Sequence, residues 1–255
     1  MRIMTLNIWG VYFGNPAGER IDAIEDTLRK YSADIFGLQE FCSGWRESGL
    51  IDRLSNKYAA VCFEKDYTPL FFLKDTFNLK DSGHFLYNNT PDESKGFTWA
   101  VLEEKATGKM LGVFNTHLWW KTGDEHEIIR EQNAMELLAS MKEIKEKYND
   151  VPVFAFGDFN SPEDKKAIKY LENNGVITSY KIADKFSPNS SHHGDPIRDE
   201  KGIYRGKITD VPKERSLDHI VTFIDDVKII EQKVVEDQTI LDATDHSPVY
   251  IDFSL

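Results

Sequence analysis

Short apolar runs separated by polar turns recur along the whole chain. Runs rich in β-branched and aromatic residues predict β-strands. The run at 151–156, VPVFAF, is apolar throughout, which is typical of a strand covered on both faces. The predicted strands span residues 3–8, 34–39, 58–63, 70–73, 98–102, 111–118, 151–156, 217–223, 227–235 and 248–253.

Apolar residues at three- and four-residue spacing predict helices between these strands. Such series cover residues 21–31 and 134–144, and a weaker helix is expected over 163–173. A few helices in a strand-rich chain favour two packed sheets with outer helices over one doubly wound parallel sheet. No linker or repeat interrupts the pattern, so residues 1–255 are expected to form a single domain.

One long polar stretch, residues 187–215, interrupts the strand pattern. A loop of this length in a compact domain is usually functional or mobile. We therefore expect it to border a functional site.

The charge of the chain limits its partners. The 43 acidic and 31 basic side chains give a formal net charge of −12, which argues against a broad basic surface for nucleic acid. It does not exclude an enzyme that reaches a phosphate ester through a metal ion. We expect no stable, broad nucleic-acid binding, and we expect a monomer.

Cysteine content and hydropathy favour a cytoplasmic protein. The two cysteines, Cys42 and Cys62, form neither a disulfide framework nor a zinc-binding spacing. No segment approaches the roughly 18 apolar residues of a membrane helix. The N-terminal MRIMTLNIWG enters a strand directly and is too short and polar for a signal peptide, so we expect an intact cytoplasmic chain.

Polar clusters mark the ends of the predicted strands. A lone acid at a strand end is most often a turn or cap residue. Several together indicate a functional site, because carboxylates are rarely buried unless they are paired or bound to metal. The clusters are Asn7, Gln39-Glu40, Asn115-Thr116-His117, Asp158 with Asn160, Asp218-His219 inside a strand, and Asp245-His246.

These residue types suit hydrolysis of a phosphate ester. The reaction needs a hard cation with oxygen ligands, a carboxylate that orients or deprotonates water, and donors for the non-bridging oxygens. Glu40 with Asn7 offers the hard ligands. Asp158 and Asn160 alternate, so a bend after the strand could aim both at one phosphate. No serine nucleophile elbow or phosphate-binding glycine loop occurs, which disfavours covalent serine catalysis and nucleoside triphosphate binding.

His246 is a candidate phosphate ligand or acid. Asp218 is a candidate partner, since an opposite charge beside a histidine keeps it protonated.

The polar clusters belong to six short motifs, which are, in chain order, LNIWG, LQE, NTHL, GDFN, LDHI and DHSPV. This ordered set resembles the endonuclease/exonuclease/phosphatase superfamily, metal-dependent phosphoesterases that include DNase I-like nucleases, neutral sphingomyelinases and inositol phosphatases. The motifs run from Asn7 to His246 and so cover nearly the whole chain. The resemblance implies an α/β (α+β) four-layer sandwich, with two packed mixed β-sheets flanked by helices and the site at one edge.

The resemblance also implies roles for the metal-binding residues. Glu40 resembles the metal-ligating glutamate, and Asn7 the asparagine that supports the metal and the phosphate. Asp245 would lie near the metal. The implied cofactor is Mg²⁺ or Mn²⁺.

Five residues resemble the catalytic set of the superfamily. Asp158 matches the aspartate that activates water, and Asn160 the asparagine that contacts the phosphate. His246 matches the histidine of the final motif, and Asp218 the aspartate that orients it. His117 matches the second histidine of the DNase I-like and sphingomyelinase-like branches.

Two positions depart from the superfamily pattern. His219 stands where the superfamily often has Tyr, Arg or another His. Strand alternation turns it away from an inward-pointing Asp218, so a structural role is expected. No acid is evident as a partner for His117. Glu103 and Glu104 are candidates by position alone.

Candidate substrate contacts lie on the same presumed rim. Trp9 follows Asn7, and Trp119 and Trp120 follow His117; these aromatic residues could stack on a base or sugar, or pack into the core. Arg130 could reach a phosphate or be paired with nearby acids. His193, in the long polar stretch, is a further candidate contact.

Three functions remain open from the sequence. The first is a phosphodiesterase or nuclease-type activity on a small or locally gripped phosphodiester. The second is a phosphomonoesterase for a sugar, inositol or lipid phosphate, and the third is a non-catalytic phosphate-binding protein. A duplex nuclease should show a basic, extended groove, whereas a phosphatase should show a pocket closed by loops such as 187–215.

Overall fold

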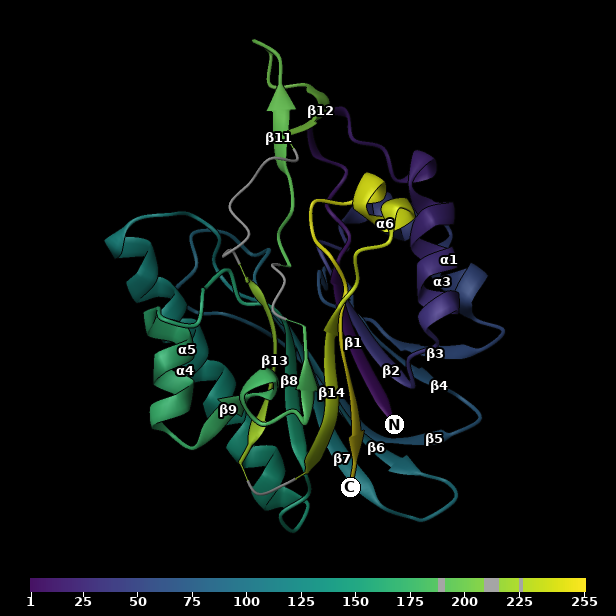
Figure 1. Ribbon diagram of the computed structural model, residues 1–255, viewed down its shortest axis with the longest axis vertical. Coiled ribbons are helices and arrows are strands. Elements are labelled where there is room, and N and C mark those ends of the chain that lie inside the picture. Colours follow the sequence, from purple (N-terminus) through teal and green to yellow (C-terminus); the bar gives the residue numbers. More distant parts are fainter. Residues whose placement is uncertain (188–190, 209–215, 225–226) are drawn as a thin grey trace.

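A computed structural model of the chain describes residues 1–187, 191–208, 216–224 and 227–255. It confirms the expected four layers: two mixed β-sheets pack face to face, and helices cover their outer faces (Figure 1). The strands are β1 (Arg2–Asn7), β2 (Ile35–Gln39), β3 (Tyr58–Val61), β4 (Leu70–Leu73), β5 (Phe77–Leu86), β6 (Gly96–Glu104), β7 (Met110–His117), β8 (Val153–Asp158), β9 (Val176–Thr178), β10 (Lys185–Phe186), β11 (Asp195–Arg198), β12 (Tyr204–Ile208), β13 (Asp218–Phe223), β14 (Lys228–Val234) and β15 (Val249–Ser254). The helices are α1 (Ile21–Tyr31), α2 (Ser43–Glu47), α3 (Leu50–Leu54), α4 (Asp124–Lys147), α5 (Lys166–Asn173) and α6 (Gln238–Ala243). Among the helices in these ranges, none combines the length and apolar character needed to cross a membrane.

The first sheet has the strand order β10-β14-β15-β1-β2-β4-β3, and the second β5-β6-β7-β8-β13-β9. Each sheet is mixed, because β1 and β2 are parallel in the first and β7 and β8 are parallel in the second. Helices α4 and α5 cover the second sheet, whereas α1, α3 and α6 lie on the opposite side of the molecule (Figure 1). The strands that carry the polar clusters therefore lie in the middle of both sheets.

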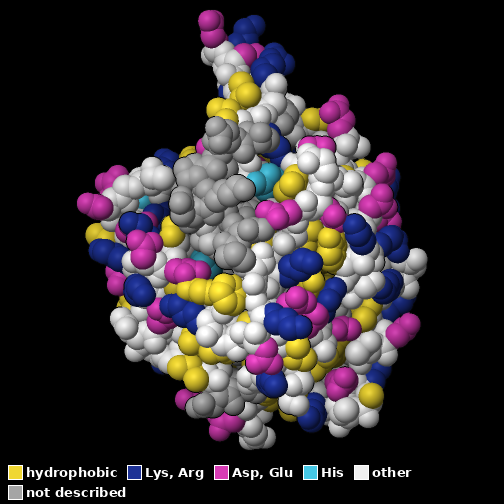
Figure 2. All heavy atoms as spheres, in the orientation of Figure 1, with side chains coloured by type: hydrophobic (Ala, Val, Ile, Leu, Met, Phe, Trp, Pro, Cys, Tyr) yellow, Lys and Arg dark blue, Asp and Glu magenta, His cyan; other side chains and the backbone are white. Residues whose placement is uncertain are grey.

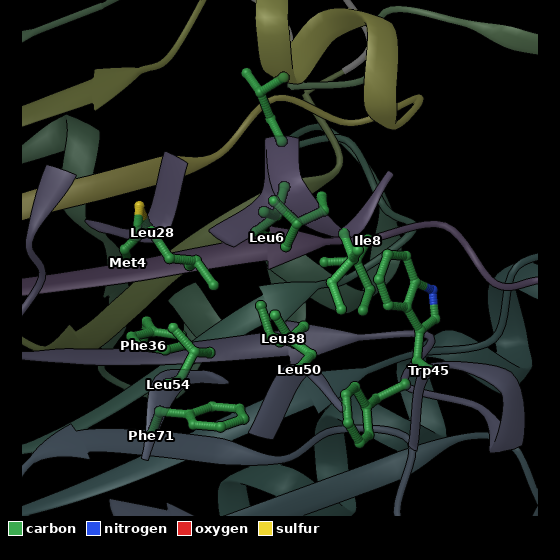
Figure 3. Close-up of a cluster of buried hydrophobic side chains, with 14 of the residues drawn as sticks. Met4, Leu6, Ile8, Leu28, Phe36, Leu38, Trp45, Leu50, Leu54 and Phe71 are labelled. Atoms are coloured by element: carbon green, nitrogen blue, oxygen red, sulfur yellow. The ribbon is translucent and has the colours of Figure 1, made fainter. Parts of the chain in front are cut away.

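Hydrophobic clusters fill the three spaces between the four layers. The cluster between the first sheet and its helices is drawn in Figure 3, where β1 and β2 direct every second side chain toward α1 and α3. A second cluster joins α4 and α5 to the outer face of the second sheet, and a third lies between the sheets. The labelled members in Figure 3 are Met4, Leu6, Ile8, Leu28, Phe36, Leu38, Trp45, Leu50, Leu54 and Phe71.

The inner faces of the two sheets change from apolar to polar along their length. Successive strand residues point to opposite faces, so every second residue of β1 and β7 enters the intersheet space. In β1 this inner series begins with Ile3 in the intersheet core and ends at Asn7, and in β7 it passes from Val113 to His117. One end of the sandwich is therefore a hydrophobic core, and the other end is a buried polar site.

A hydrogen-bonded pair of amides marks the border between these two ends. Gln39 Nε2 donates to Asn115 Oδ1 at 2.6 Å, which links β2 in the first sheet to β7 in the second. Asn115 Nδ2 donates in turn to the backbone oxygens of Leu38 and Pro69. Gly37 leaves room for this pair, because a Cβ there would lie 2.3 Å from the Asn115 side chain. The two sheets are thus aligned by specific polar contacts as well as by apolar packing.

Each predicted strand overlaps a strand of the structure, but the sequence patterns missed several elements. The longest missed element is β5, an edge strand that pairs only with β6. Its central residues are mostly polar, so no strand pattern was visible there. The helices α2, α3 and α6 are too short for a helical period to be visible.

The long polar stretch is not a plain loop in its described part. Strands β11 and β12 form an antiparallel hairpin that projects from the body of the molecule (Figure 1). The remaining parts of the stretch, residues 188–190 and 209–215, lie outside the described residues. The expectation of a loop over 187–215 is corrected to this extent.

Candidate active site

Strand ends bring the predicted catalytic residues together. Asn7 is the last residue of β1, Glu40 follows β2, and His117 and Asp158 end the parallel strands β7 and β8. Strand β13 runs antiparallel to β8, so its first residue, Asp218, pairs with Asp158. All five face one buried edge of the sandwich because the carboxyl ends of the parallel strands meet there.

The backbone turns sharply just after three of these strands. Trp9, Glu40 and Asn160 have φ angles of 54°, 62° and 47°, in the left-handed region that non-glycine residues rarely adopt. Each such residue costs roughly 1–2 kcal/mol, so surrounding contacts must hold it. For Glu40 one such contact is the backbone N–H of Gly10, which donates to Oε2 at 2.7 Å. Strain gathered at one edge of the fold is typical of a functional site.

Asp158 lies at the centre of the site. Its Oδ2 accepts a hydrogen bond from Asn7 Nδ2 at 3.0 Å, and its Oδ1 accepts one from the backbone N–H of Asn160 at 2.8 Å. The Nε2 atoms of His117 and His246 lie 3.3 Å and 3.8 Å from Oδ2. Burial alone would raise the pKa of Asp158, but these two histidines and the Asn160 N–H outweigh it and hold the pKa well below its usual range. Asp158 is therefore an ionised carboxylate.

His246 is paired with a buried aspartate. Its Nδ1 lies 2.7 Å from Asp218 Oδ2, and its Nε2 points toward Asp158. Burial lowers the pKa of His246, but the carboxylates of Asp218 and Asp158 have the larger combined effect and raise it well above the usual value. Ser191 Oγ accepts the backbone N–H groups of Leu217 and Asp218, which fixes the aspartate beside the ring. His246 is thus an imidazolium that can donate from Nε2 into the cavity.

His117 has a lysine as a second neighbour, besides Asp158. Lys95 Nζ lies 3.0 Å from His117 Nε2 and 3.2 Å from Nδ1. Glu103 and Glu104 are at the other end of β6, where they pair with Met110 and Phe77, so neither reaches His117. The expectation of Glu103 or Glu104 as the partner is wrong, because the antiparallel register of β6 and β7 places Gly96, next to Lys95, opposite His117.

The carboxylates on the other side of Asp158 fit a divalent cation. Glu40, which is half-buried, and Asp245, which is buried, line the same cavity as Asp158. Burial raises the pKa of Asp245, the charge of His246 opposes this rise, and Glu40 and Asp158 add to it, so that the pKa is about 7. A hard cation would relieve this repulsion, and oxygen atoms are the ligands that Mg²⁺ and Mn²⁺ prefer. Glu40 and Asp245, supported by Asn7, are the residues that could hold it.

Arg20 supports this side of the site from behind, and the sequence patterns did not single it out. It is 7% exposed, and its guanidinium packs over the Trp45 ring at 4.9 Å. Its donors bind backbone oxygens of the segment after β1 and of the turn before Asp245. These acceptors are Ile8, Trp9, Gly10, Asn15, Pro16 and Ala243.

Of the two cationic residues that the sequence patterns missed, Arg20 carries a weak local signal and Lys95 carries none. Arg20 occupies the N-cap position of α1, where a small polar residue is the usual choice, and this mismatch was the only local indication. Nothing local marks Lys95, because lysines are mostly exposed.

A cavity of about 1170 Å³ opens over the site. The aromatic residues Trp9, Tyr12, Tyr67 and Trp120 line it, and its charged lining outside the catalytic set is mixed. That lining comprises Lys65, Lys95, Lys121 and Arg198 together with Asp92, Glu93 and Asp195. On the face drawn in Figure 2, basic and acidic side chains are interspersed, and its coloured residues form no continuous basic band. The cavity suits a compact substrate better than an extended polyanion.

The predicted substrate contacts are placed unevenly. Trp9 lines the cavity, but Trp119 is 1% exposed and donates from Nε1 to His126 Nδ1, whereas its neighbour Trp120 is 55% exposed and lines the cavity. The expectation for Trp119 is corrected, because the chain leaves the strand at this point and turns Trp119 into the core.

Arg130 and His193 also turn away from the cavity. Arg130 is buried and donates to the backbone oxygens of Trp119 and Lys121, so it fixes the segment after His117 and does not line the cavity. His193 contacts Ser247 Oγ and the backbone oxygen of Leu241. The cavity instead receives His192, whose ring packs edge-on against His246 with centroids 4.9 Å apart.

His219 turns to the outer face of its sheet, as strand alternation predicted. Its Nε2 lies 2.8 Å from the backbone oxygen of Ser161, and its ring packs against Phe159.

Comparison with known proteins gives the family and the fold of the chain. The model of the endonuclease/exonuclease/phosphatase family matches residues 4–246. No curated protein sequence matches the chain.

Several solved structures share the fold over the full chain. A mannosyl-6-phosphatase from Bacteroides thetaiotaomicron has a TM-score of 0.80 at 20% identity and covers 100% of both chains. An endonuclease/exonuclease/phosphatase from Bacteroides vulgatus has a TM-score of 0.78 at 24% identity, over 100% of this chain and 98% of its own. The human Nocturnin catalytic domain has a TM-score of 0.73 at 22% identity, over 100% and 94%. With the family model matching nearly the whole sequence, the chain belongs to the endonuclease/exonuclease/phosphatase family of phosphoesterases.

Proposed function

We propose that the protein hydrolyses the phosphoester bond of a small molecule with the aid of a divalent cation, Mg²⁺ or Mn²⁺. The observation that carries this proposal is the meeting of Glu40, Asp158 and Asp245 with the His246–Asp218 pair on one wall of the cavity. Carboxylates beside an imidazolium are the groups that hydrolysis of a phosphoester requires.

Glu40 and Asp245, with Asn7 as support, would hold the cation. When bound, the cation supplies positive charge to the phosphoryl and leaving oxygens. Asn7 contributes by its hydrogen bonds, since its Nδ2 donates to both Glu40 Oε1 and Asp158 Oδ2. The amide thus keeps the cation-binding carboxylate and the catalytic carboxylate at a fixed separation.

The remaining residues act on water and phosphate. Asp158 is ionised and accepts a hydrogen bond from the attacking water, which orients it toward phosphorus. His246 donates from Nε2 to a phosphoryl oxygen, and Asp218 keeps it protonated. The Asn160 amide lines the same cavity. One of its N–H groups donates to the backbone oxygen of Leu118, and the other, 3.0 Å from His117 Nε2, would turn to a phosphoryl oxygen. Water adds hydroxyl to phosphorus, the bond from phosphorus to the leaving oxygen breaks, and that oxygen gains a proton.

Three features favour a small substrate. The cavity carries charges of both signs, the hairpin β11–β12 contributes Asp195 and Arg198 to its wall, and the chain has a net charge of −12. The structural similarity to a mannosyl-6-phosphatase, which covers both chains completely, is consistent with a compact ester. The catalytic groups named above serve a phosphodiester and a phosphomonoester alike.

The test is one assay series with Mg²⁺, Mn²⁺ or EDTA on plasmid DNA, a sugar phosphate, p-nitrophenyl phosphate and bis-p-nitrophenyl phosphate. We expect hydrolysis of small esters that EDTA abolishes, and a loss of about 10³-fold in kcat for Asp158→Asn because the neutral amide cannot act as a base. Asp164→Asn, an exposed carboxylate of the same type, is the matched control. Wild-type turnover by a folded Asp158→Asn variant would contradict the proposed mechanism. Faster cleavage of plasmid DNA than of every small ester would contradict the proposed substrate class.

A further inference from the structure

Lys95 is a buried cation on the wall of the catalytic cavity. Its side chain belongs to a residue that is only 6% exposed, yet it lines the cavity together with Glu40, His117 and Asp158. Within the described part of the chain, no carboxylate forms an ion pair with it; its nearest polar partners are the two ring nitrogens of His117. Burying a charge that has no opposite charge in direct contact costs free energy. The buried position of the Lys95 ammonium therefore indicates an anionic ligand.

The register of β6 fixes the position of Lys95 at the cavity wall. Lys95 precedes Gly96, which pairs with His117 on one side and Leu86 on the other. A Cβ at Gly96 would lie 2.2 Å from the backbone oxygen of Phe85, so glycine is required for β6 to begin at this register. The register holds the lysine against His117 and aims its ammonium at the cavity.

The electrostatic surroundings of Lys95 favour an added anion. Burial lowers the pKa of Lys95, and the carboxylates of Glu40 and Asp158 oppose that effect. An anion bound beside Nζ would stabilise the ammonium further. Because an ammonium has only donors, one ring nitrogen of His117 accepts from it. With Nδ1 as that acceptor, Nε2 is left to face Asp158 Oδ2 at 3.3 Å, and His117 orients the lysine.

Phosphate monoesters and diesters differ in the group that Lys95 could bind. A monoester has three non-bridging oxygens and two negative charges near neutral pH, whereas a diester has two such oxygens and one charge. His246 and Asn160 offer donors for two oxygens in either case. A third cationic donor has a partner only on the monoester.

We propose that the Lys95 ammonium binds the additional non-bridging oxygen of a phosphomonoester, and that it makes this site prefer phosphomonoesters over phosphodiesters. The inference rests on the proposed phosphoester hydrolysis and specifies its substrate class. The reaction is then addition of water to a monoester: a new bond forms between the water oxygen and phosphorus, the ester P–O bond breaks, and the products are an alcohol and inorganic phosphate.

Two chromogenic esters with the same leaving group test the specificity. For p-nitrophenyl phosphate, we expect kcat/KM to fall about 10- to 100-fold in Lys95→Gln, which corresponds to one hydrogen bond to a charged group. For bis-p-nitrophenyl phosphate the same variant should change kcat/KM by less than about threefold, because the lost donor has no partner there. The wild type should prefer the monoester, and Lys95→Arg should retain part of that preference. Lys142→Gln, on the exposed face of α4, is the control for loss of one positive charge.

Two further measurements separate ligand binding from folding. Calorimetric titration of inorganic phosphate into the Mg²⁺-loaded protein should show weaker binding by Lys95→Gln than by wild type or Lys142→Gln. Thermal unfolding of the ligand-free protein should show an unchanged or raised Tm for Lys95→Gln, because a neutral amide is less costly to bury than an unpaired cation. A purely structural lysine would instead lower the Tm and reduce both ester activities equally.

The outcomes that contradict each level of the inference are distinct. Equal losses on both esters, a wild-type preference for the diester, or unaltered phosphate affinity in Lys95→Gln would overturn the role of Lys95. Absence of hydrolysis of either ester by the wild type with Mg²⁺ or Mn²⁺ would overturn the proposed function itself.

Discussion

His246 and His117 enter the same cavity from different sheets. The Nε2 atoms of both rings lie near Asp158 Oδ2, but their Nδ1 atoms meet opposite charges. His246, just before β15, has Asp218 Oδ2 at 2.7 Å from Nδ1, whereas His117, at the end of β7, has Lys95 Nζ at 3.2 Å from Nδ1. The carboxylate makes His246 a proton donor, while the ammonium makes a nitrogen of His117 an acceptor. The comparison teaches that the neighbour decides what a histidine does.

The two sides of the cavity, one lined by His246 and the other by His117, also differ in the groups that they would bind. The His246 side contains Asp245 and lies next to the candidate cation ligands, and its histidine is directed at the phosphate. The His117 side contains Lys95 and Asn160, whose Nδ2 lies 3.0 Å from His117 Nε2. We interpret the first side as the reacting side and the second as a positioning side.

Substitution of the two histidines tests this division most strongly. We expect His246→Gln to lower kcat by about 10³-fold, since it removes a charged donor to the transition state. His117→Gln should lower kcat by only about tenfold, because glutamine retains an acceptor for Lys95 and loses only the ring geometry. Steady-state kinetics on p-nitrophenyl phosphate, with circular dichroism to confirm folding, is the measurement. Equal losses, or a larger loss for His117→Gln, would contradict the division.

Arg20 allows the cation-binding part of the His246 side to be perturbed separately. Arg20→Met should raise the Mg²⁺ concentration for half-maximal activity about tenfold, as loss of groups that orient metal ligands usually does. The reason is that Arg20 holds the backbone of Gly10, which binds Glu40, and of Ala243, which precedes Asp245. Arg20→Lys should restore part of the affinity.

A second arginine serves as the matched control for this experiment. Arg2 lies near the other end of β1 and forms an ion pair with Asp252, so Arg2→Met should leave the Mg²⁺ requirement unchanged. If Arg20→Met lowers the Tm without changing the Mg²⁺ requirement, Arg20 is structural and not a positioning residue.

The smallest expected effect on catalysis is that of Trp120, on the His117 side, and the adjacent Trp119 is its comparison. Trp120→Ala should raise KM a few-fold and change stability by less than about 0.5 kcal/mol, because its side chain is exposed on the cavity wall. Trp119→Ala should cost about 3–5 kcal/mol of unfolding free energy, since it empties a buried site. Urea unfolding and the KM for a sugar phosphate are the measurements. A change in KM for Trp119→Ala alone would reverse the assignment of the two residues.

Much of the fold followed from patterns within single segments. The predicted strands and the four-layer arrangement are confirmed, and the polar residues at the strand ends do meet at one edge. These features depend on local alternation, which places Asn7, His117 and Asp158 on the inner face of whichever sheet contains them. The single domain and the location of the chain stay predictions.

The amino-acid sequence by itself determined which side chains stand at the inner-face ends of strands, because alternation and strand length are local properties. Only the tertiary structure decided which neighbours these side chains meet. Lys95, in place of Glu103 or Glu104, contacts His117 because the register of β6 against β7 is set by long-range pairing. Trp119 is buried and Trp120 exposed because alternation no longer applies once the strand has ended. Register and loop direction are properties of the whole packed chain, and these properties give the two histidines their different surroundings.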